Sequence, residues 1–514
     1  MPDLIVTRPN MSFIHVECLT DGLRYDIKEF FSCYAPKYKF HPKYQLVERS
    51  NGSKFRPWNG KTSFYKLNIR DLPHGLLYML EEFIRERNIT AEFRFKVQKN
   101  TFDDAWFEEF YECIFKSKDF YPRDYQHHAV KMLLNEKRGT IEYGTGAGKS
   151  NIIYCLIRFL LAMKRRVCLI VPNIMLVEQM KTEFIKYGWE DIDDFLTAQY
   201  YGNTPDIKKP VLVSTFQSLV KMEDGIVESY TGVITDETHM AKSESIMNIL
   251  SRMTKADYRF GVTGTLPEAK EDTIIDLLTI YGYIGKMVAR KPASELIEEG
   301  YLSDMSVAVI KIRHPEAWTK SLRYAEYEDE VDYLVNCKPR LEVLDYIISN
   351  GHKDGENILI LCERLEHINL VHQYLVEKYP NFKVSLIHGK IKAKDRIKIQ
   401  NEVKVTSNNI VVATFGTMAV GVDIPKIDHV VLNSSYKSKT KVVQSIGRGL
   451  RKHDDKEQLI VWDLVDDMRW ITKGGNEKMN CTYKQYLVRL EHYNNQKYPV
   501  FEHEIKLQNV EELT

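Results

Sequence analysis

A glycine-rich loop between a strand-like run and an apolar helix constrains the fold of this chain more than any other feature. Residues 139–150 read GTIEYGTGAGKS, and apolar residues follow at helical spacing from Ile152 to Leu160. Glycines let backbone N–H groups approach a phosphate without an intervening Cβ, and the start of the next helix adds a positive dipole. We therefore expect an α/β domain with a phosphate site made by Thr145, Gly146, Ala147, Gly148, Lys149 and Ser150.

The side chains of this loop have distinct expected roles. Lys149 neutralises the β and γ phosphates of a nucleotide, and the Ser150 hydroxyl ligates Mg²⁺. Tyr143 stands where the strict GxxxxGK[ST] pattern has its first glycine. A glycine-rich turn followed by lysine also arises by chance, so the assignment draws on the flanking strand and helix.

Two stretches of the chain alternate strand-like and helical segments. The first has apolar runs at 167–171, 211–215, 232–236 and 260–263, and the second at 358–362, 384–387, 410–413, 430–432 and 459–462. Such alternation predicts parallel sheets covered by helices. With a charged connector near 312–330, the chain divides into expected domains at 1–115, 116–310 and 311–514, the last with a C-terminal tail.

The first region is expected to be a small α+β domain that binds nucleic acid. Its clearest helix is predicted over residues 75–87. The whole chain has a formal net charge of only +1, but residues 36–70 hold nine Lys or Arg against the single acid Glu48. Four of these lysines are candidate DNA contacts: Lys37, Lys39, Lys43 and Lys61. Interleaved aromatics serve either as base-stacking surfaces or as the core of this domain: Tyr38, Phe40, Tyr44, Phe55 and Trp58.

Several protein classes are disfavoured by composition. Apolar stretches are interrupted by Arg or Lys before they reach the roughly 18–20 residues of a membrane span. The N-terminus lacks the pattern of a secretory signal, so we expect a cytoplasmic protein without membrane contact. Eight cysteines show no CxxC pair or zinc-like spacing, which argues against a structural metal or disulfides.

An acidic pair and a distant arginine pair complete the expected chemistry. Asp236 and Glu237 follow the strand-like run 232–236, where Asp236 would hold Mg²⁺ and Glu237 would act as the base. Acidic pairs are also common on solvated turns. Arg448 and Arg451 are three residues apart and would share one helix face, either as surface cations or as fingers that reach a nucleotide on another domain.

These segments, in this order, resemble the motif set of superfamily 2 helicases over roughly residues 121–465. The matching segments are 121–126, the phosphate loop, 169–173, 213–217, the DETH run 236–239, 262–265, 358–364, 413–423 and QSIGRGLR at 444–451. The resemblance implies two RecA-like domains and a nucleic-acid-stimulated ATPase that uses ATP and Mg²⁺. It also implies that Arg123, Gln126, Gly421 and Asp423 contact the nucleotide, and that Gln444, Arg448 and Arg451 take part in hydrolysis.

Within the superfamily, the chain is similar to phage recombination helicases. The similar runs are 38–43, 58–61, 72–76, 437–439, 444–453 and 461–467. This resemblance implies remodelling of branched DNA by branch migration, fork regression and R-loop unwinding, in recombination, repair and replication. The partners would be forked or branched DNA and RNA–DNA hybrids, with the protein acting as a monomer.

Polar residues at predicted strand ends are candidate contacts to the sugar-phosphate backbone. They are Asn173, Thr215, Gln217, Arg364, Thr414 and Lys437. Two other functions stay open at this point: a duplex translocase that does not separate strands, and an ATP-gated annealing or clamp protein.

Overall fold

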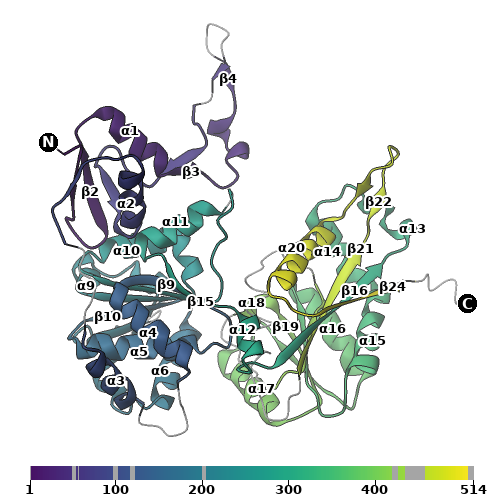
Figure 1. Cartoon of the computed structure of the whole chain (residues 1–514). Helices are drawn as coiled ribbons and strands as arrows, with labels where there is room; N and C mark the ends of the chain where they lie inside the picture. Colours follow the sequence, from purple (N-terminus) through teal and green to yellow (C-terminus); the bar gives the residue numbers. More distant parts are fainter. Residues whose placement is uncertain are drawn as a thin grey trace, which may run out of the picture. The chain divides into compact units, whose positions relative to one another are not determined.

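A computed structural model describes residues 2–48, 54–55, 57–96, 102–115, 122–199, 204–271, 273–419, 426–434 and 458–507 (Figure 1). The chain divides into two compact units, one of residues 1–143 and 148–290, the other of residues 144–147 and 291–514. None of the helices in the described ranges combines the length and hydropathy that a membrane crossing requires.

A small N-terminal domain begins the first unit. Its sheet has the order β7-β2-β1-β8, from β1 (Leu4–Thr7), β2 (Phe13–Cys18), β7 (Asp71–Pro73) and β8 (Ala91–Phe93). Helices α1 (Asp21–Phe30) and α2 (Leu77–Glu86) supply Ile27, Leu80 and Phe83 to its core. The helix predicted over 75–87 is present, with its first turn as the 3-10 segment His74–Leu76.

This domain sits tightly on α11 (Ile274–Tyr283) of the following sheet domain. Leu278 and Tyr281 of α11 join the N-terminal core. A Cβ at Gly75 would lie 1.9 Å from the Tyr281 carbonyl oxygen, so only glycine permits this approach. The buried Arg259 guanidinium also donates to Ser12 Oγ at 2.7 Å. The N-terminal domain is therefore packed as a continuation of the first unit.

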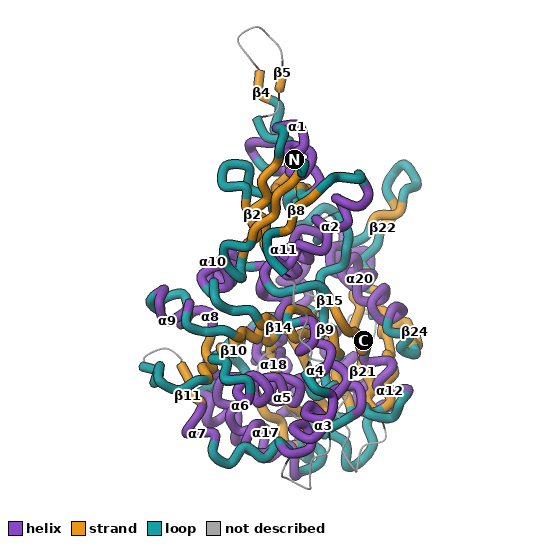
Figure 2. The backbone as a smooth tube through the Cα atoms, turned by 60° about the vertical axis from the view of Figure 1, so that its left-hand side comes forward, coloured by secondary structure: helices purple, strands orange, loops and turns teal. Residues whose placement is uncertain are grey.

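A basic arm projects from the N-terminal domain, and Figure 2 shows its hairpin standing away from the sheets. We define it as the described part of residues 32–63. Strands β3 (Ser32–Tyr34) and β6 (Lys61–Ser63) form its base, and β4 (Val47–Glu48) pairs with β5 (Lys54–Phe55) further out. The 3-10 turns η1 (Tyr38–Phe40) and η2 (Pro42–Tyr44) lie between them.

The first seven-stranded sheet has the order β11-β12-β10-β13-β14-β9-β15. Its strands are β9 (Arg138–Tyr143), β10 (Val167–Val171), β11 (Leu196–Gln199), β12 (Val211–Thr215), β13 (Gly232–Asp236), β14 (Tyr258–Thr263) and β15 (Met287–Lys291). The pairs from β11 to β9 are parallel. Helices of this domain include α4 (Asp124–Glu136), α5 (Lys149–Ala162), α6 (Ile174–Lys186), α8 (Phe216–Leu219) and α10 (Glu244–Arg252). Buried strands with continuous apolar runs are what a sheet covered on both faces requires.

The second seven-stranded sheet is parallel throughout, in the order β18-β19-β17-β20-β21-β16-β24. Its strands are β16 (Asp304–Arg313), β17 (Ile358–Cys362), β18 (Lys383–Ile387), β19 (Asn409–Thr414), β20 (His429–Leu432), β21 (Gln458–Asp467) and β24 (Val500–Lys506). Its helices include α14 (Tyr327–Asn336), α15 (Glu342–Gly351), α16 (Leu365–Lys378), α17 (Ala393–Val405) and α20 (Cys481–Asn495). Two parallel-sheet α/β domains behind a small α+β domain confirm the expected fold class.

The structure places both domain boundaries earlier in the chain than the expected positions after residues 115 and 310. Helix α3 (Asp104–Cys113) stacks Phe107 on Phe159 of α5, with ring centroids 4.8 Å apart, so it covers the first seven-stranded sheet domain. The boundary expected after residue 310 lies inside β16, which pairs with β21 from Asp304 to Arg313. Residues 304–310 therefore belong to the second sheet, because strand pairing overrides the nearness of this segment in sequence to the first domain.

Candidate ATP site and nucleic-acid contacts

The phosphate loop connects β9 to α5 through two glycines with left-handed backbone. Gly146 has φ +86° and Gly148 has φ +75°, a region that side chains with a Cβ rarely adopt. The Ala147 N–H donates to the Gly144 carbonyl at 3.1 Å, and Gly148 caps the first turn of α5. The strand, loop and helix of the predicted phosphate site are thus all present.

The two functional side chains of the loop have partners within the first unit. Lys149 Nζ donates to the Tyr143 carbonyl oxygen at 3.1 Å. Ser150 Oγ lies 3.0 Å from the Tyr187 hydroxyl. Both groups stand at the first turn of α5.

The acidic pair stands at the carboxyl end of β13. Burial and the neighbouring Glu237 carboxylate raise the pKa of Asp236, and the nearby Lys149 ammonium opposes that rise. The Glu237 N–H donates to Asp236 Oδ1 at 2.9 Å, and Glu237 itself has φ +49°. Left-handed backbone at a non-glycine residue is typical of functional turns.

The donor set at this position fits a magnesium ion. Mg²⁺ is usually held by one or two carboxylates together with hydroxyl and phosphate oxygens, rather than by a closed protein cage. Asp236 and Ser150 offer such oxygens. Within the described ranges, no group of three or more His, Cys, Asp or Glu side chains forms a metal cluster.

His239 and Thr238 link the acidic turn to the end of β14. His239 Nδ1 lies 3.2 Å from Thr263 Oγ1 and 3.4 Å from Glu237 Oε2, and Thr238 Oγ1 donates to the Val262 carbonyl at 3.1 Å. The sequence did not predict these contacts of His239 and Thr238, because their partners lie 24 residues later in the chain. A chain of contacts thus connects Glu237 to Thr263 through His239.

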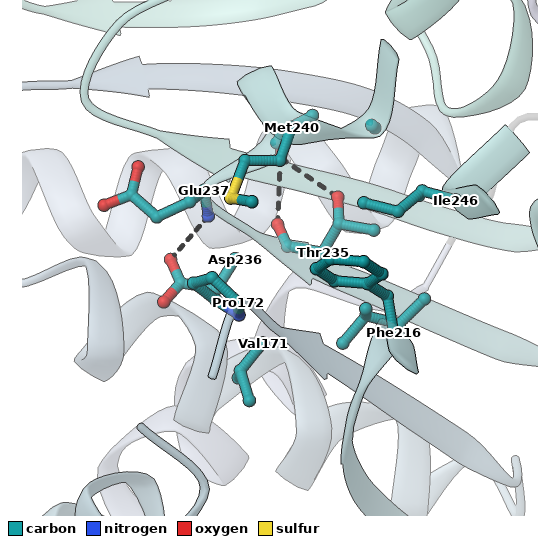
Figure 3. Close-up of a pocket in the computed structure, with 11 residues that line it drawn as sticks. Val171, Pro172, Phe216, Thr235, Asp236, Glu237, Met240 and Ile246 are labelled. Atoms are coloured by element: carbon teal, nitrogen blue, oxygen red, sulfur yellow. Dashed lines mark hydrogen bonds between the residues drawn. The ribbon is translucent and has the colours of Figure 1, made fainter. Parts of the chain in front are cut away.

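A small pocket beside Asp236 gathers three of the motif-bearing loops (Figure 3). Pro172 enters from the end of β10 and Phe216 from the end of β12, while Asp236 and Glu237 come from β13. The remaining lining is largely apolar and includes Ile170, Val171, Thr235, Thr238, Met240, Ala241 and Ile246. Segments far apart in sequence thus meet at one edge of the first seven-stranded sheet.

Family models cover most of this architecture in order. Residues 3–94 match the N-terminal domain of the DNA helicase UvsW, residues 119–268 the res subunit of type III restriction enzymes, and residues 339–453 the helicase conserved C-terminal domain. The chain belongs to the superfamily 2 helicases. It is an enzyme that hydrolyses ATP, and it binds nucleic acid.

Relatives of this helicase include phage and archaeal proteins. The ATP-dependent DNA helicase uvsW of Enterobacteria phage T4 is 26% identical over 513 residues, which cover 96% of this chain and 98% of the relative. The DNA 3′-5′ translocase XPB2 of Sulfurisphaera tokodaii is 27% identical over 371 residues, 66% of this chain and 80% of the relative. A putative HsdR subunit of a type I restriction enzyme from Vibrio vulnificus has a similar fold, with a TM-score of 0.56 at 17% identity, covering 90% of this chain and 80% of that one.

Gln126 and Arg123, which are predicted to contact the nucleotide, lie on and just before α4, and Gln126 lies beside the phosphate loop. Gln126 is buried, and its Oε1 accepts the Arg123 N–H at 3.0 Å. A Cβ at Gly148 would come within 2.2 Å of Gln126 Nε2, which shows how closely this side chain approaches the loop. Arg123 Nη1 donates to the Tyr125 hydroxyl at 2.8 Å. Adenine contact by Gln126 and nucleotide contact by Arg123 stay predictions.

The candidate contacts to the sugar-phosphate backbone in the two sheet domains differ in how far their polar groups already have partners. Asn173 caps α6 through Oδ1, and its buried Nδ2 has no hydrogen-bond partner among the described residues. Thr215 is buried and bonds Ser218, Gln217 is exposed, and Thr414 Oγ1 lies 2.8 Å from Thr417 Oγ1. Arg364 is instead paired with three carboxylates, from Glu328, Asp332 and Glu366. A phosphate would compete with these carboxylates for Arg364.

The candidate lysines of the basic arm also differ in whether they are exposed or already paired. Lys37, Lys39 and Lys43 are exposed, whereas Lys61 pairs with Glu29 and lies over the Tyr34 ring. Six other predicted site residues lie outside the described residues: Gly421, Asp423, Lys437, Gln444, Arg448 and Arg451. Their roles stay predictions.

Proposed function

We propose that this helicase uses ATP to remodel branched DNA, by branch migration, fork regression and R-loop unwinding in recombination, repair and replication. The observation that carries the proposal is the basic arm on a domain that packs closely against the first seven-stranded sheet domain. A movement of that sheet domain would be passed directly to DNA held by the arm. The match of residues 3–94 to the N-terminal domain of a DNA helicase supports the same conclusion.

The proposed ATP cycle uses both sheet domains. Gln126 contacts the base, Arg123 contacts the nucleotide, Lys149 and the loop N–H groups hold the phosphates, and Glu237 acts as the base toward the attacking water. Asp236 and Ser150 would hold Mg²⁺, which neutralises charge that develops on the phosphate oxygens. Arg448, Arg451 and Gln444 reach the nucleotide from the second domain on closure, so hydrolysis depends on domain movement.

A translocase that follows duplex DNA without separating it is the second candidate. It is favoured by the relative named a DNA 3′-5′ translocase. The two functions share the ATP site and differ in products, because only remodelling releases or exchanges strands at a fork.

The test compares strand exchange and ATP hydrolysis on matched substrates. The full chain is incubated with ATP and Mg²⁺ on single strands, duplexes, forks, four-way junctions and R-loops, and labelled strands are followed on native gels. Remodelling predicts strand products from the branched substrates and the highest ATP turnover with them. ATP turnover on duplex without any strand product would reject remodelling in favour of the translocase.

The arm is tested separately by replacing Lys37, Lys39 and Lys43 together with alanine. For each of these lysines that binds a DNA phosphate, the slope of log affinity against log salt should fall by up to about 0.9. Alanine at Lys164, Lys186 and Lys208, which are exposed on the first sheet domain, is the matched control. An unchanged salt slope in the arm variant would rule out the arm as a DNA contact.

A further inference from the structure

The aromatic residues of the basic arm fall into two groups with different surroundings. Tyr38 stacks on Tyr34, with ring centroids 4.4 Å apart, and meets the Tyr44 ring edge at 4.9 Å. Gly60, at φ +83°, leaves room for Tyr38, since a Cβ there would lie 2.5 Å from the Tyr38 ring. Tyr38 is 8% exposed. Tyr34, Tyr38 and Tyr44 therefore form the internal packing of the arm.

Phe40 has the opposite environment, because 83% of its surface is exposed to solvent. Its backbone is nevertheless held in place. The Phe40 N–H donates to the Lys37 carbonyl at 2.9 Å, and the His41 N–H donates to the Tyr38 carbonyl at 3.0 Å. The packed Tyr38 ring, two residues earlier, anchors the same turn. The arm thus presents a phenyl ring outward on a turn whose direction is set.

The charges around Phe40 indicate what could cover it. Lys37, Lys39 and Lys43 are exposed in the same two turns, and all three are cations. Such a surface favours a polyanion through counterion release. A phenyl ring gains from a nucleic acid only where a base face is open, because paired bases hide their faces in the stack.

We propose that Phe40 stacks on an unpaired base at the point where DNA strands separate. This inference rests on the proposed function, since it requires a branched substrate, and it names the residue that distinguishes a branch from plain duplex. The three lysines hold the flanking phosphates and Phe40 reads the open base. Tyr34, Tyr38 and Tyr44 support the turn from inside.

The experiment measures stacking directly on the full chain. A fork carries 2-aminopurine as the first unpaired base, and a blunt duplex of equal length serves as the reference. We compare Phe40→Ala, Phe40→Trp and, as matched control, Tyr25→Ala, which removes a 60% exposed aromatic from α1 outside the arm. Fluorescence of 2-aminopurine and binding affinity are recorded for each protein.

Wild type, Phe40→Trp and Tyr25→Ala should quench the fluorescence of 2-aminopurine, and Phe40→Ala should not. Loss of one stacked base should weaken fork binding by Phe40→Ala about tenfold, with duplex binding unchanged. Equal fork affinity and equal quenching in Phe40→Ala and wild type would overturn the inference. A parallel fall in fork and duplex affinity would also overturn it, by giving Phe40 a structural role in the arm.

The two proposals fail in different ways. Quenching by wild type but not by Phe40→Ala, without any strand product from forks, leaves the stacking contact standing and rejects remodelling. Strand products from both proteins with equal quenching retain remodelling and reject the stacking contact.

Discussion

Replacement of Lys149 by methionine tests the phosphate site at the point where charge matters most. Methionine retains the unbranched side chain but removes the ammonium group. The substitution removes the hydrogen bond from Lys149 Nζ to the Tyr143 carbonyl at 3.1 Å, and this loss should lower the free energy of unfolding by about 1 kcal/mol. Removing a charged donor from the transition state should cost about 3–4 kcal/mol, or 10²- to 10³-fold in ATP turnover.

Turnover is measured as phosphate release with saturating single-stranded DNA, alongside DNA binding and urea unfolding of the same samples. Lys186→Met, at the exposed last residue of α6, is the matched control and should behave as wild type. DNA affinity of Lys149→Met should be largely unchanged. Turnover within tenfold of wild type would refute the site, and loss of more than about 3 kcal/mol of stability would refute the local reasoning.

Four further outcomes follow from contacts in the two units. In Gly148→Ala the alanine must adopt φ +75° and displace Gln126, so the free energy of unfolding should fall by about 1–3 kcal/mol and nucleotide affinity should also fall. The control Gly355→Ala, at φ +97° with open space around it, should keep nucleotide affinity. Arg340→Met leaves the buried Asp466 carboxylate without its guanidinium, and urea unfolding should show a loss of about 3–5 kcal/mol; a loss under about 1 kcal/mol contradicts this. Burial lowers the pKa of His74 to about 2, so the neutral ring stabilises the folded state above pH 6.5. Below pH 6.5 this contribution falls by about 1.4 kcal/mol per pH unit. His74→Gln should therefore flatten the dependence of the free energy of unfolding on pH between pH 6.5 and 5. Chelation of Mg²⁺ should abolish ATP hydrolysis, and added Mg²⁺ should restore it; turnover that persists in chelator rejects the metal.

The elements that the sequence predicted best are the buried strands, because each is marked by its own unbroken run of apolar residues. The runs 167–171, 211–215, 232–236 and 358–362 coincide with β10, β12, β13 and β17. Strands buried on both faces read as unbroken apolar runs, so neither their type nor their limits require knowledge of the neighbours. The phosphate loop is local in the same sense, because its glycines, lysine and serine act within one turn.

Contacts between distant segments were decided only by tertiary structure. The strand β16 was missed and assigned across a domain boundary, since its membership depends on pairing with β21 more than 140 residues later. Lys61 and Arg364 were predicted to contact nucleic acid, but Glu29 pairs with Lys61 and nearby carboxylates pair with Arg364. The link from His239 to Thr263 was invisible for the same reason.

The arm shows the division most directly. In the sequence, aromatic residues alternate with lysines, and the pattern alone did not decide which aromatic rings belong to the core and which stack on DNA bases. Only the folded arm, in which Tyr34, Tyr44 and Gly60 enclose Tyr38, leaves Phe40 exposed. Residue type determines what a side chain can bind, but its exposure is set by neighbours that the chain brings together only on folding.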